Sequence, residues 1–202
     1  MSADRYLTLA GESDGLYREK ASKFLAWAFP IPDEETFRTR MEAIAREHHT
    51  SRHVCYAWIL DADGQRYRAN DAGEPSGTAG KPMLRQLQAL SLTHAAVVVV
   101  RYFGGTLLGK AGLVHAYAEA AREALAHNTI VERVLLHDLI LHCTYAQLED
   151  VRNDLLKMHG EVRNASYGEP CELLVALPAS MIGTCSEKWM RMGITVKDDQ
   201  AK

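Results

Sequence analysis

The order of apolar and polar residues predicts that helices and strands alternate along the first two thirds of the chain. Apolar residues recur every three or four positions in residues 33–48, as expected of an amphipathic helix with Asp33 as its N-cap. Residues 53–60 are dense in aromatic and β-branched side chains and, with a return strand at residues 65–69, predict a β-hairpin. Residues 95–100 are continuously apolar, which indicates a strand in the middle of a sheet that is covered on both faces.

Four further elements and one connection complete this part of the pattern. Pro82 is tolerated in the first turn of a helix, and the apolar residues that follow it predict a short helix that ends at Ser91. A longer helix is expected to run to about residue 127, followed by a short join at residues 128–133. The remaining expected elements are a strand or arm around residues 6–9 and a strand at residues 23–29.

The pattern starts again after the join and predicts a second, smaller domain. Its expected elements, in order, are a strand at 134–143, a helix at 147–158, strands at 162–167 and 172–177, a helix that includes 181–192, and a strand at 194–197. The order β-α-β-β-α-β is that of the ferredoxin-like fold. We therefore predict an α+β protein with two domains, residues 1–131 and 132–202, in which helices cover both sheets.

Two glycine-rich loops flank the central apolar strand, one from Asn70 to Pro82 and one from Arg101 to Gly112. Glycine loops that lead into helices expose backbone N–H groups and so favour anion binding, although glycines also serve tight turns and close packing. With basic residues in or beside both loops, we predict an anion-binding groove. Its candidate ligand-binding residues are Ser76, Gly77, Thr78, Gly80, Lys81, Arg101, Gly104, Gly105, Gly109 and Lys110.

The second loop comes within one residue of the Walker A pattern. Ala111 stands where that pattern has the hydroxyl that holds magnesium, and Leu107 and Leu108 put bulk where phosphates would lie. No apolar strand that ends in aspartate follows to supply a second magnesium ligand. The sequence therefore disfavours a P-loop NTPase, and we predict no bound cofactor.

The first loop contains carboxylates that are candidates for hydrolytic chemistry. Asp71 or Glu74 could act as an acid or base, with His53 at the start of a strand that leads toward this loop. The alternative is that Asp71 and Thr78 bind loop and helix-cap amides and that His53 is an ordinary hydrogen-bonding residue. Ser76 does not fit a nucleophile elbow, because Glu74 stands where that motif has glycine. The histidines show no zinc spacing, and we predict no metal site.

Composition narrows the class of protein. The net charge of −3 is distributed as 15 basic against 15 acidic residues in 1–131 and 8 against 11 in the remainder, so neither half is a basic module. The four cysteines are far apart and mostly within apolar runs, which suits buried thiols in a reducing compartment. The N-terminal residues are too charged for a signal peptide, and no apolar run approaches the ~20 residues of a membrane span. We expect a cytoplasmic protein that does not enter the membrane.

The residues of both loops resemble the YigZ/IMPACT family. The resemblance is carried by residues 71–84 and 98–109, and by His53, Cys55 and Ala57 in a His-x-Cys-x-Ala strand. It implies an N-terminal IMPACT domain, an α/β sandwich like the second domain of a small-subunit ribosomal protein. It also implies a C-terminal ferredoxin-like domain similar to one in elongation factor G. For bacterial members it suggests binding to nucleic acid or the ribosome.

We therefore hypothesise a translation-associated binding or regulatory protein. A groove lined by Lys81, Arg101 and loop amides would hold RNA, the ribosome or another phosphate-bearing ligand. One alternative is a hydrolase that acts on a small phosphate or peptide substrate through Asp71 or Glu74 near His53. Another is a protein-interaction module that docks partners on the exposed sheet of the C-terminal domain.

Overall fold

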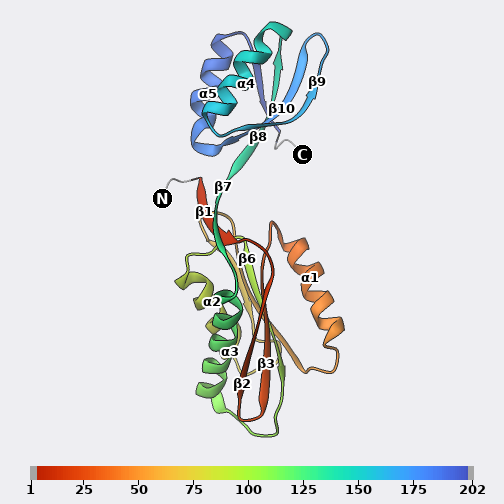
Figure 1. The fold of residues 1–202 in the computed structure, drawn as a ribbon, viewed down its shortest axis with the longest axis vertical. Coiled ribbons are helices and arrows are strands. Elements are labelled where there is room, and N and C mark those ends of the chain that lie inside the picture. The colour runs from red at the N-terminus through yellow and green to blue at the C-terminus, as the bar shows by residue number, and fades with distance from the viewer. Residues whose placement is uncertain (1–3, 200–202) are drawn as a thin grey trace. The chain divides into compact units, whose positions relative to one another are not determined.

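The computed structural model describes residues 4–199, which form two compact units (Figure 1). The larger unit contains residues 6–133, and the smaller contains residues 134–199 together with residues 4 and 5. The predicted two-domain α+β class is confirmed, whereas the boundary between residues 131 and 132 stays a prediction. Among the helices of residues 4–199, none is long and apolar enough to cross a membrane.

A five-stranded sheet organises the larger unit. Its strands are β2 (Ser13–Glu19), β3 (Ser22–Pro30), β4 (His53–Leu60), β5 (Arg66–Asn70) and β6 (Ala95–Tyr102). The spatial order is β2-β3-β6-β4-β5, and all neighbours are antiparallel. Residues 95–100 of β6 are fully buried, which confirms the prediction of a central strand covered on both faces.

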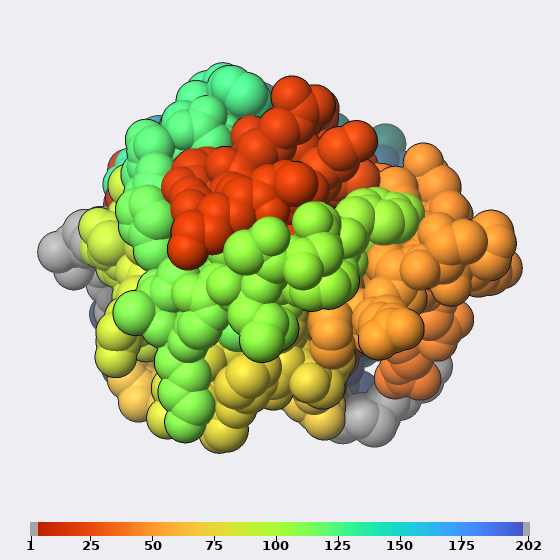
Figure 2. All heavy atoms as spheres, turned by 90° about the horizontal axis from the view of Figure 1, so that it is seen from below, coloured from red at the N-terminus to blue at the C-terminus, as the bar shows by residue number. Residues whose placement is uncertain are grey.

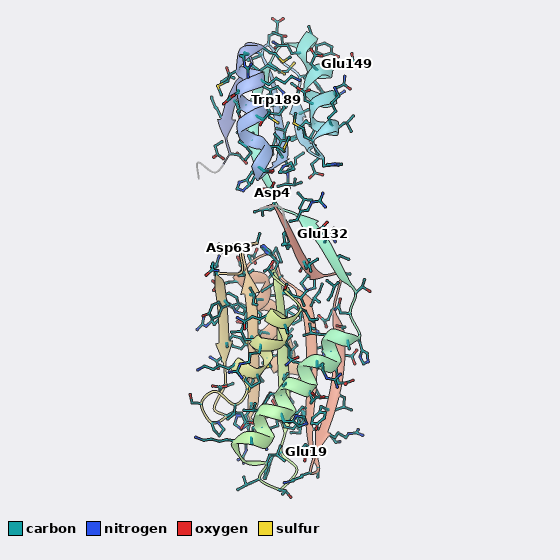
Figure 3. The ribbon with its side chains drawn as sticks, turned by 90° about the vertical axis from the view of Figure 1, so that its left-hand side faces the viewer. Asp4, Glu19, Asp63, Glu132, Glu149 and Trp189 are labelled. Atoms are coloured by element: carbon teal, nitrogen blue, oxygen red, sulfur yellow. The ribbon has the colours of Figure 1, made fainter. Side chains whose placement is uncertain are left out.

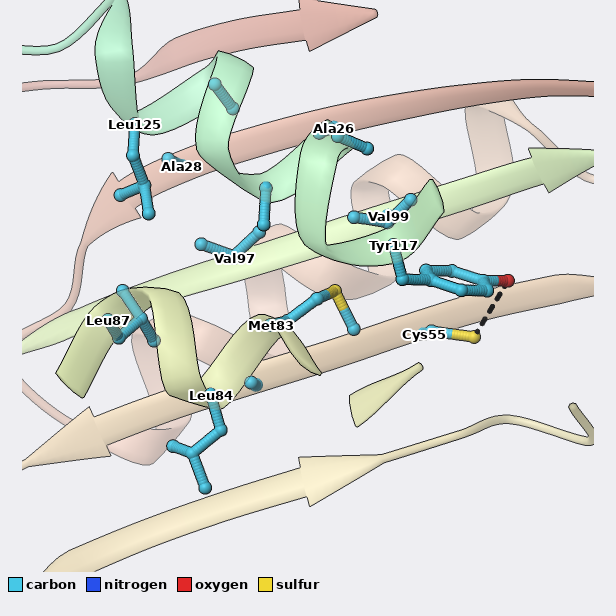
Figure 4. Close-up of a cluster of buried hydrophobic side chains, with 14 of the residues drawn as sticks. Ala26, Ala28, Cys55, Met83, Leu84, Leu87, Val97, Val99, Tyr117 and Leu125 are labelled. Carbon is cyan, nitrogen blue, oxygen red and sulfur yellow. Dashed lines mark hydrogen bonds between the residues drawn. The ribbon is translucent and has the colours of Figure 1, made fainter. Parts of the chain in front are cut away.

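Helices cover both faces of this sheet. They are α1 (Glu34–Glu47), α2 (Gly80–Ala89) and α3 (Gly109–Ala126). Helices α2 and α3 pack on one face, where residues such as Met83, Val97 and Tyr117 form a common core (Figure 4). Helix α1 covers the opposite face. Its start is capped as predicted, because Asp33 Oδ1 accepts a hydrogen bond of 2.7 Å from the N–H of Thr36.

Two strands differ from the sequence-based prediction. Strand β2 was not expected, because its sequence is mostly polar. It packs against α3 at Gly15, where only glycine fits because a Cβ atom would lie 2.4 Å from the backbone nitrogen of Ala124. The predicted join contains β7 (Ile130–Val134), which pairs with β1 (Arg5–Leu9) in a two-stranded sheet. Backbone hydrogen bonds form both strands without a strong apolar pattern, so neither β2 nor β7 is evident from periodicity.

The smaller unit has the predicted ferredoxin-like arrangement. Its elements are β8 (Leu136–Cys143), a 3₁₀ turn (Tyr145–Gln147), α4 (Leu148–Lys157), β9 (Glu161–Ser166), β10 (Cys171–Pro178), α5 (Ala179–Arg191) and β11 (Thr195–Asp198). The strands lie in the order β11-β8-β10-β9 and are all antiparallel. Trp189, which is labelled in Figure 3, is fully buried in this unit, and its Nε1 donates a hydrogen bond of 3.1 Å to Asp154. All four cysteines of the chain are free and buried, as expected.

Candidate functional site

The two glycine loops lie at one end of the larger unit, which we call the loop end. The first glycine loop (residues 71–79) joins β5 to α2, and the second (residues 103–108) joins β6 to α3. Because β4 and β6 are antiparallel, β4 begins where β6 ends, and His53 lies opposite Arg101. Figure 2 looks onto this end, and Glu19 marks it in Figure 3. The fold therefore brings His53 and Arg101 to the same end as the two glycine loops. Within residues 4–199, however, Ser76, Lys81 and Lys110 form no hydrogen bond or ion pair with one another.

Asp71 organises the first glycine loop. Its Oδ1 accepts hydrogen bonds from the N–H groups of Ala79 (2.9 Å) and Gly80 (2.8 Å), and its Oδ2 accepts one from Gly77 (2.8 Å). Burial alone would raise the pKa of Asp71, but these three donors and the charge of Lys81 hold the pKa below its usual value. The carboxylate of the chain itself thus occupies the donors that the sequence offered to an external anion.

The other predicted residues of this loop have structural or peripheral positions. Thr78 is buried, and its hydroxyl donates a hydrogen bond of 2.6 Å to the carbonyl of Pro75. Ser76 is exposed. Lys81 is also exposed, in the first turn of α2, and its side chain passes close to Gly77. Of this loop's predicted ligand-binding side chains, Ser76 and Lys81 therefore remain accessible.

Glu74 and Arg101 form a buried ion pair beneath the loops. Arg101 Nη1 lies 2.7 Å from Glu74 Oε1, and the two side chains are 7% and 3% exposed. The guanidinium carbon of Arg101 also lies over the rings of Phe24 (5.6 Å) and Phe103 (5.5 Å). Arg101 was expected to face a phosphate directly, but its charge is already balanced by Glu74. Arg101 therefore contacts Glu74, Phe24 and Phe103 from its buried position.

Tyr117 and Cys55 extend this buried network. The hydroxyl of Tyr117 donates a hydrogen bond of 2.9 Å to Glu74 Oε1, and the thiol of Cys55 lies 3.4 Å from the same hydroxyl (Figure 4). Burial raises the pKa of Cys55 to about 12, and burial also raises the pKa of Tyr117. Both groups therefore stay protonated at neutral pH, and the Cys55 thiol is unsuited to nucleophilic chemistry.

His53 connects β4 to the first glycine loop. Its Nδ1 lies 2.9 Å from the carbonyl oxygen of Ala72, within hydrogen-bond distance when Nδ1 carries the proton. This position fits the hydrogen-bonding alternative for His53. Since Asp71 binds loop amides and Glu74 binds Arg101 and Tyr117, neither carboxylate is free to act with His53 as an acid or base. Residues 4–199 also contain no cluster of His, Cys, Asp or Glu side chains that could hold a metal ion.

The glycines of the second glycine loop differ in their surroundings. Gly104 serves packing, because its N–H donates to Ser22 Oγ (3.1 Å) and a Cβ atom there would lie 2.1 Å from the backbone of Ala21. Gly105 and Gly109, by contrast, have positive φ angles of 84° and 70° and face open space. Helix α3 begins at Gly109 without a side-chain cap. Its first turn carries the exposed Lys110, which favours anions on this side of the loop end.

An open hollow of about 600 Å³ lies beside these loops, and we call it the loop-end hollow. Ser51 Oγ and Arg101 Nε are buried there without a hydrogen-bond partner in residues 4–199. Arg52 is exposed and forms no ion pair with the described residues. The aromatic ring of Phe103 is 56% exposed. The lining residues are Thr50, Ser51, Arg52, His53, Arg101, Tyr102, Phe103 and Leu107.

Sequence reasoning missed the contribution of Arg52, Tyr102 and Phe103 to this hollow. Tyr102 and Phe103 directly follow Arg101, so a basic residue and two aromatics stand where β6 passes into the second glycine loop, a combination that favours nucleic-acid contact. Arg52 directly precedes β4, which an antiparallel pairing with β6 would bring to the same end. The sequence alone would therefore have indicated these three residues if β4 and β6 had been predicted to pair antiparallel.

A protein-family model matches each of the two units. The Impact N-terminal domain model matches residues 20–125, and a domain of unknown function (DUF1949) matches residues 141–188. IMPACT family member YigZ of Escherichia coli (strain K12) is 38% identical over 171 residues, which cover 84% of each chain. IMPACT family member YvyE of Bacillus subtilis (strain 168) is 32% identical and covers 84% of this chain and 77% of its own.

One solved structure is similar over almost the whole chain. It is a crystal structure of a hypothetical protein, 33% identical in sequence, with a TM-score of 0.73. The match covers 98% of this chain and 99% of that one. The arrangement of elements described above is therefore shared by a protein of known structure.

Proposed function

This chain belongs to the IMPACT family, and we propose that it is a translation-associated binding protein of the cytoplasm whose larger unit binds RNA, free or within the ribosome. The link to translation comes from the family resemblance, in which the N-terminal domain is similar to a domain of a ribosomal protein. Likeness of fold is an analogy. The case for RNA rests instead on the chemistry of the loop-end hollow.

The observation that carries the proposal is the mixture of groups in that hollow. Arg52 offers hydrogen-bond donors, Phe103 offers an exposed ring, and none of the eight lining residues is acidic. Phosphate groups need such donors, and bases need such apolar surface. Lys110, in the first turn of α3, and Lys23, which lies opposite Tyr102 on β3, extend the positive surface nearby.

Arg52 is the side chain best placed to contact phosphate. It is exposed and without an ion pair in residues 4–199, whereas Arg101 is buried against Glu74. Removing Arg101 would leave the Glu74 carboxylate buried and unpaired, which typically costs about 3–5 kcal/mol of folding stability. A loss of binding in an Arg101 variant would therefore report misfolding as readily as a lost phosphate contact.

The test is the salt dependence of RNA binding. Replacing Arg52 with glutamine should weaken binding to ribosomal RNA and reduce the slope of log K against log salt by about 0.7–0.9, since one phosphate contact is lost. Filter binding across about 50–200 mM salt measures this slope. Arg38→Gln, an exposed arginine of α1, is the matched control and should leave the slope unchanged. Absence of RNA and ribosome binding by the unmodified chain at low salt would refute the proposal.

The alternative of a hydrolase gains no support from the geometry. The carboxylates of Asp71 and Glu74 are both occupied by donors of the chain, and the lowered pKa of Asp71 leaves it ionised at neutral pH. A general acid or base works best with a pKa near the operating pH. RNA binding is therefore the function that this end of the molecule supports best.

A further inference from the structure

Resting on that proposed function, we propose that the loop-end hollow binds single-stranded RNA and stacks an unpaired base on Phe103. Duplex RNA is recognised mainly through its shape and backbone, and its bases are covered by one another. A base that is splayed out of a single strand exposes its face to aromatic side chains. The exposed ring of Phe103 in the hollow can stack on a base of single-stranded RNA but not on the covered bases of a duplex.

Phe103 is held in place as a stacking platform. The guanidinium carbon of Arg101 lies over its ring, 5.5 Å from the centroid, and Arg101 is itself fixed by the 2.7 Å ion pair with Glu74. On the neighbouring strand, Phe24 also contacts this guanidinium at 5.6 Å. Despite this support, Phe103 remains 56% exposed. The ring is thus anchored on one side and accessible to a ligand.

The surroundings of Phe103 favour a base over a lone phosphate. Leu107 lines the same hollow and is 84% exposed, so two large apolar side chains face solvent together. A single exposed apolar residue is ordinary, but adjacent ones in a hollow indicate an apolar part of a ligand. Ser51 Oγ, buried without a partner in residues 4–199, supplies a polar group at the same wall.

The shape and charge of the hollow fit a strand that enters it. Its volume of about 600 Å³ lies in the range of small-ligand sites, which suits one splayed nucleotide rather than the side of a helix. Arg52 lines the hollow as an exposed cation that can contact the backbone of the same strand. Stacking and charge are therefore supplied by different residues, and they can be tested separately.

The experiment compares a labelled single-stranded RNA of about 12 nucleotides, without self-complementarity, with its duplex by fluorescence anisotropy at low salt. We expect the single strand to bind at least tenfold more tightly. Phe103→Leu should weaken single-strand binding about tenfold without changing the salt slope, because a stacking contact and no phosphate contact is lost. Phe103→Trp should retain the affinity. Tyr67→Leu, which removes a ring that is also 56% exposed but lies on β5, is the matched control.

Each outcome separates this inference from the proposed function. Equal affinity for duplex and single strand, or unchanged binding in Phe103→Leu, would overturn single-strand stacking and leave RNA binding in place. A similar loss in Tyr67→Leu would also overturn it, because the effect would not belong to the hollow. Failure of both RNAs to bind the unmodified chain would refute the proposed function itself, together with this inference.

Discussion

Asp71 and Glu74 stand three residues apart in the first glycine loop, yet their carboxylates receive different donors. Asp71 accepts from three backbone amides, and Glu74 accepts from Arg101 and Tyr117. From residue type and spacing, either carboxylate could have been a catalytic acid or base or an acceptor for groups of the loop. Only the positions of Arg101 and Tyr117, 27 and 43 residues away along the chain, decide how Glu74 is used. Such long-range partners cannot be read from local sequence.

Replacing Asp71 with asparagine tests its role in the loop. The variant loses one anionic acceptor and should be less stable at pH 7 by about 1–3 kcal/mol, because a loop amide loses its partner. The folded-state pKa of Asp71 is lowered, so its stabilisation is fully present above its unfolded pKa of about 3.9 and is lost as pH falls through the folded pKa. Urea unfolding at pH 7, 5 and 3 should show the difference between the two proteins shrinking at the lowest pH. A constant difference would contradict this assignment.

At the scale of elements, periodicity was informative where one face of a segment is buried. It predicted α1 with its Asp33 cap, the hairpin of β4 and β5, and the central position of β6, all of which the structure confirms. It failed for β2, whose residues are mostly polar, and for β7, a strand of only five residues whose apolar positions do not alternate. The loop-end hollow was predicted only in part, because its walls combine the start of β4 with the end of β6.

Helix α5 offers a test of intrinsic helix stability. Gly183 lies inside α5, is exposed, and has nothing within 4 Å of the position of an added Cβ atom. Gly183→Ala should therefore stabilise the smaller unit by about 0.5–1 kcal/mol. Gly160→Ala should destabilise it, because the new Cβ would lie 2.8 Å from the carbonyl oxygen of Ala176. Hydrogen exchange in peptides from β8 and β10, followed across a urea series, measures the stability of the smaller unit in both variants. A change of the same sign in both would contradict the packing described here.

At the scale of the whole molecule, each unit has its own hydrophobic core. The cores on the two sheet faces of the larger unit contain only its own residues, and the core around Trp189 contains only residues of the smaller unit. Cores that share no residues allow the units to lose structure independently. The buried Asp154, which receives hydrogen bonds from Trp189 and Lys188, provides a way to perturb one core alone.

We expect Asp154→Asn to destabilise the smaller unit and to leave the larger unit unchanged. Asparagine keeps an acceptor for Trp189 but loses the charge that pairs with Lys188. Hydrogen-exchange mass spectrometry should show faster exchange in peptides from β8, β10 and α5, with unchanged protection in β6. An equal loss of protection in β6 would show that the two units unfold together.

The internal carboxylate contacts of the first glycine loop have a kinetic consequence for ligand binding. Because Glu74 holds Arg101, and the guanidinium of Arg101 contacts the ring of Phe103, this part of the wall of the hollow is formed before any ligand arrives. A preorganised site avoids the entropic cost of ordering a loop on binding. Association then needs no slow conformational step, so affinity differences among ligands should reside mainly in their dissociation rates.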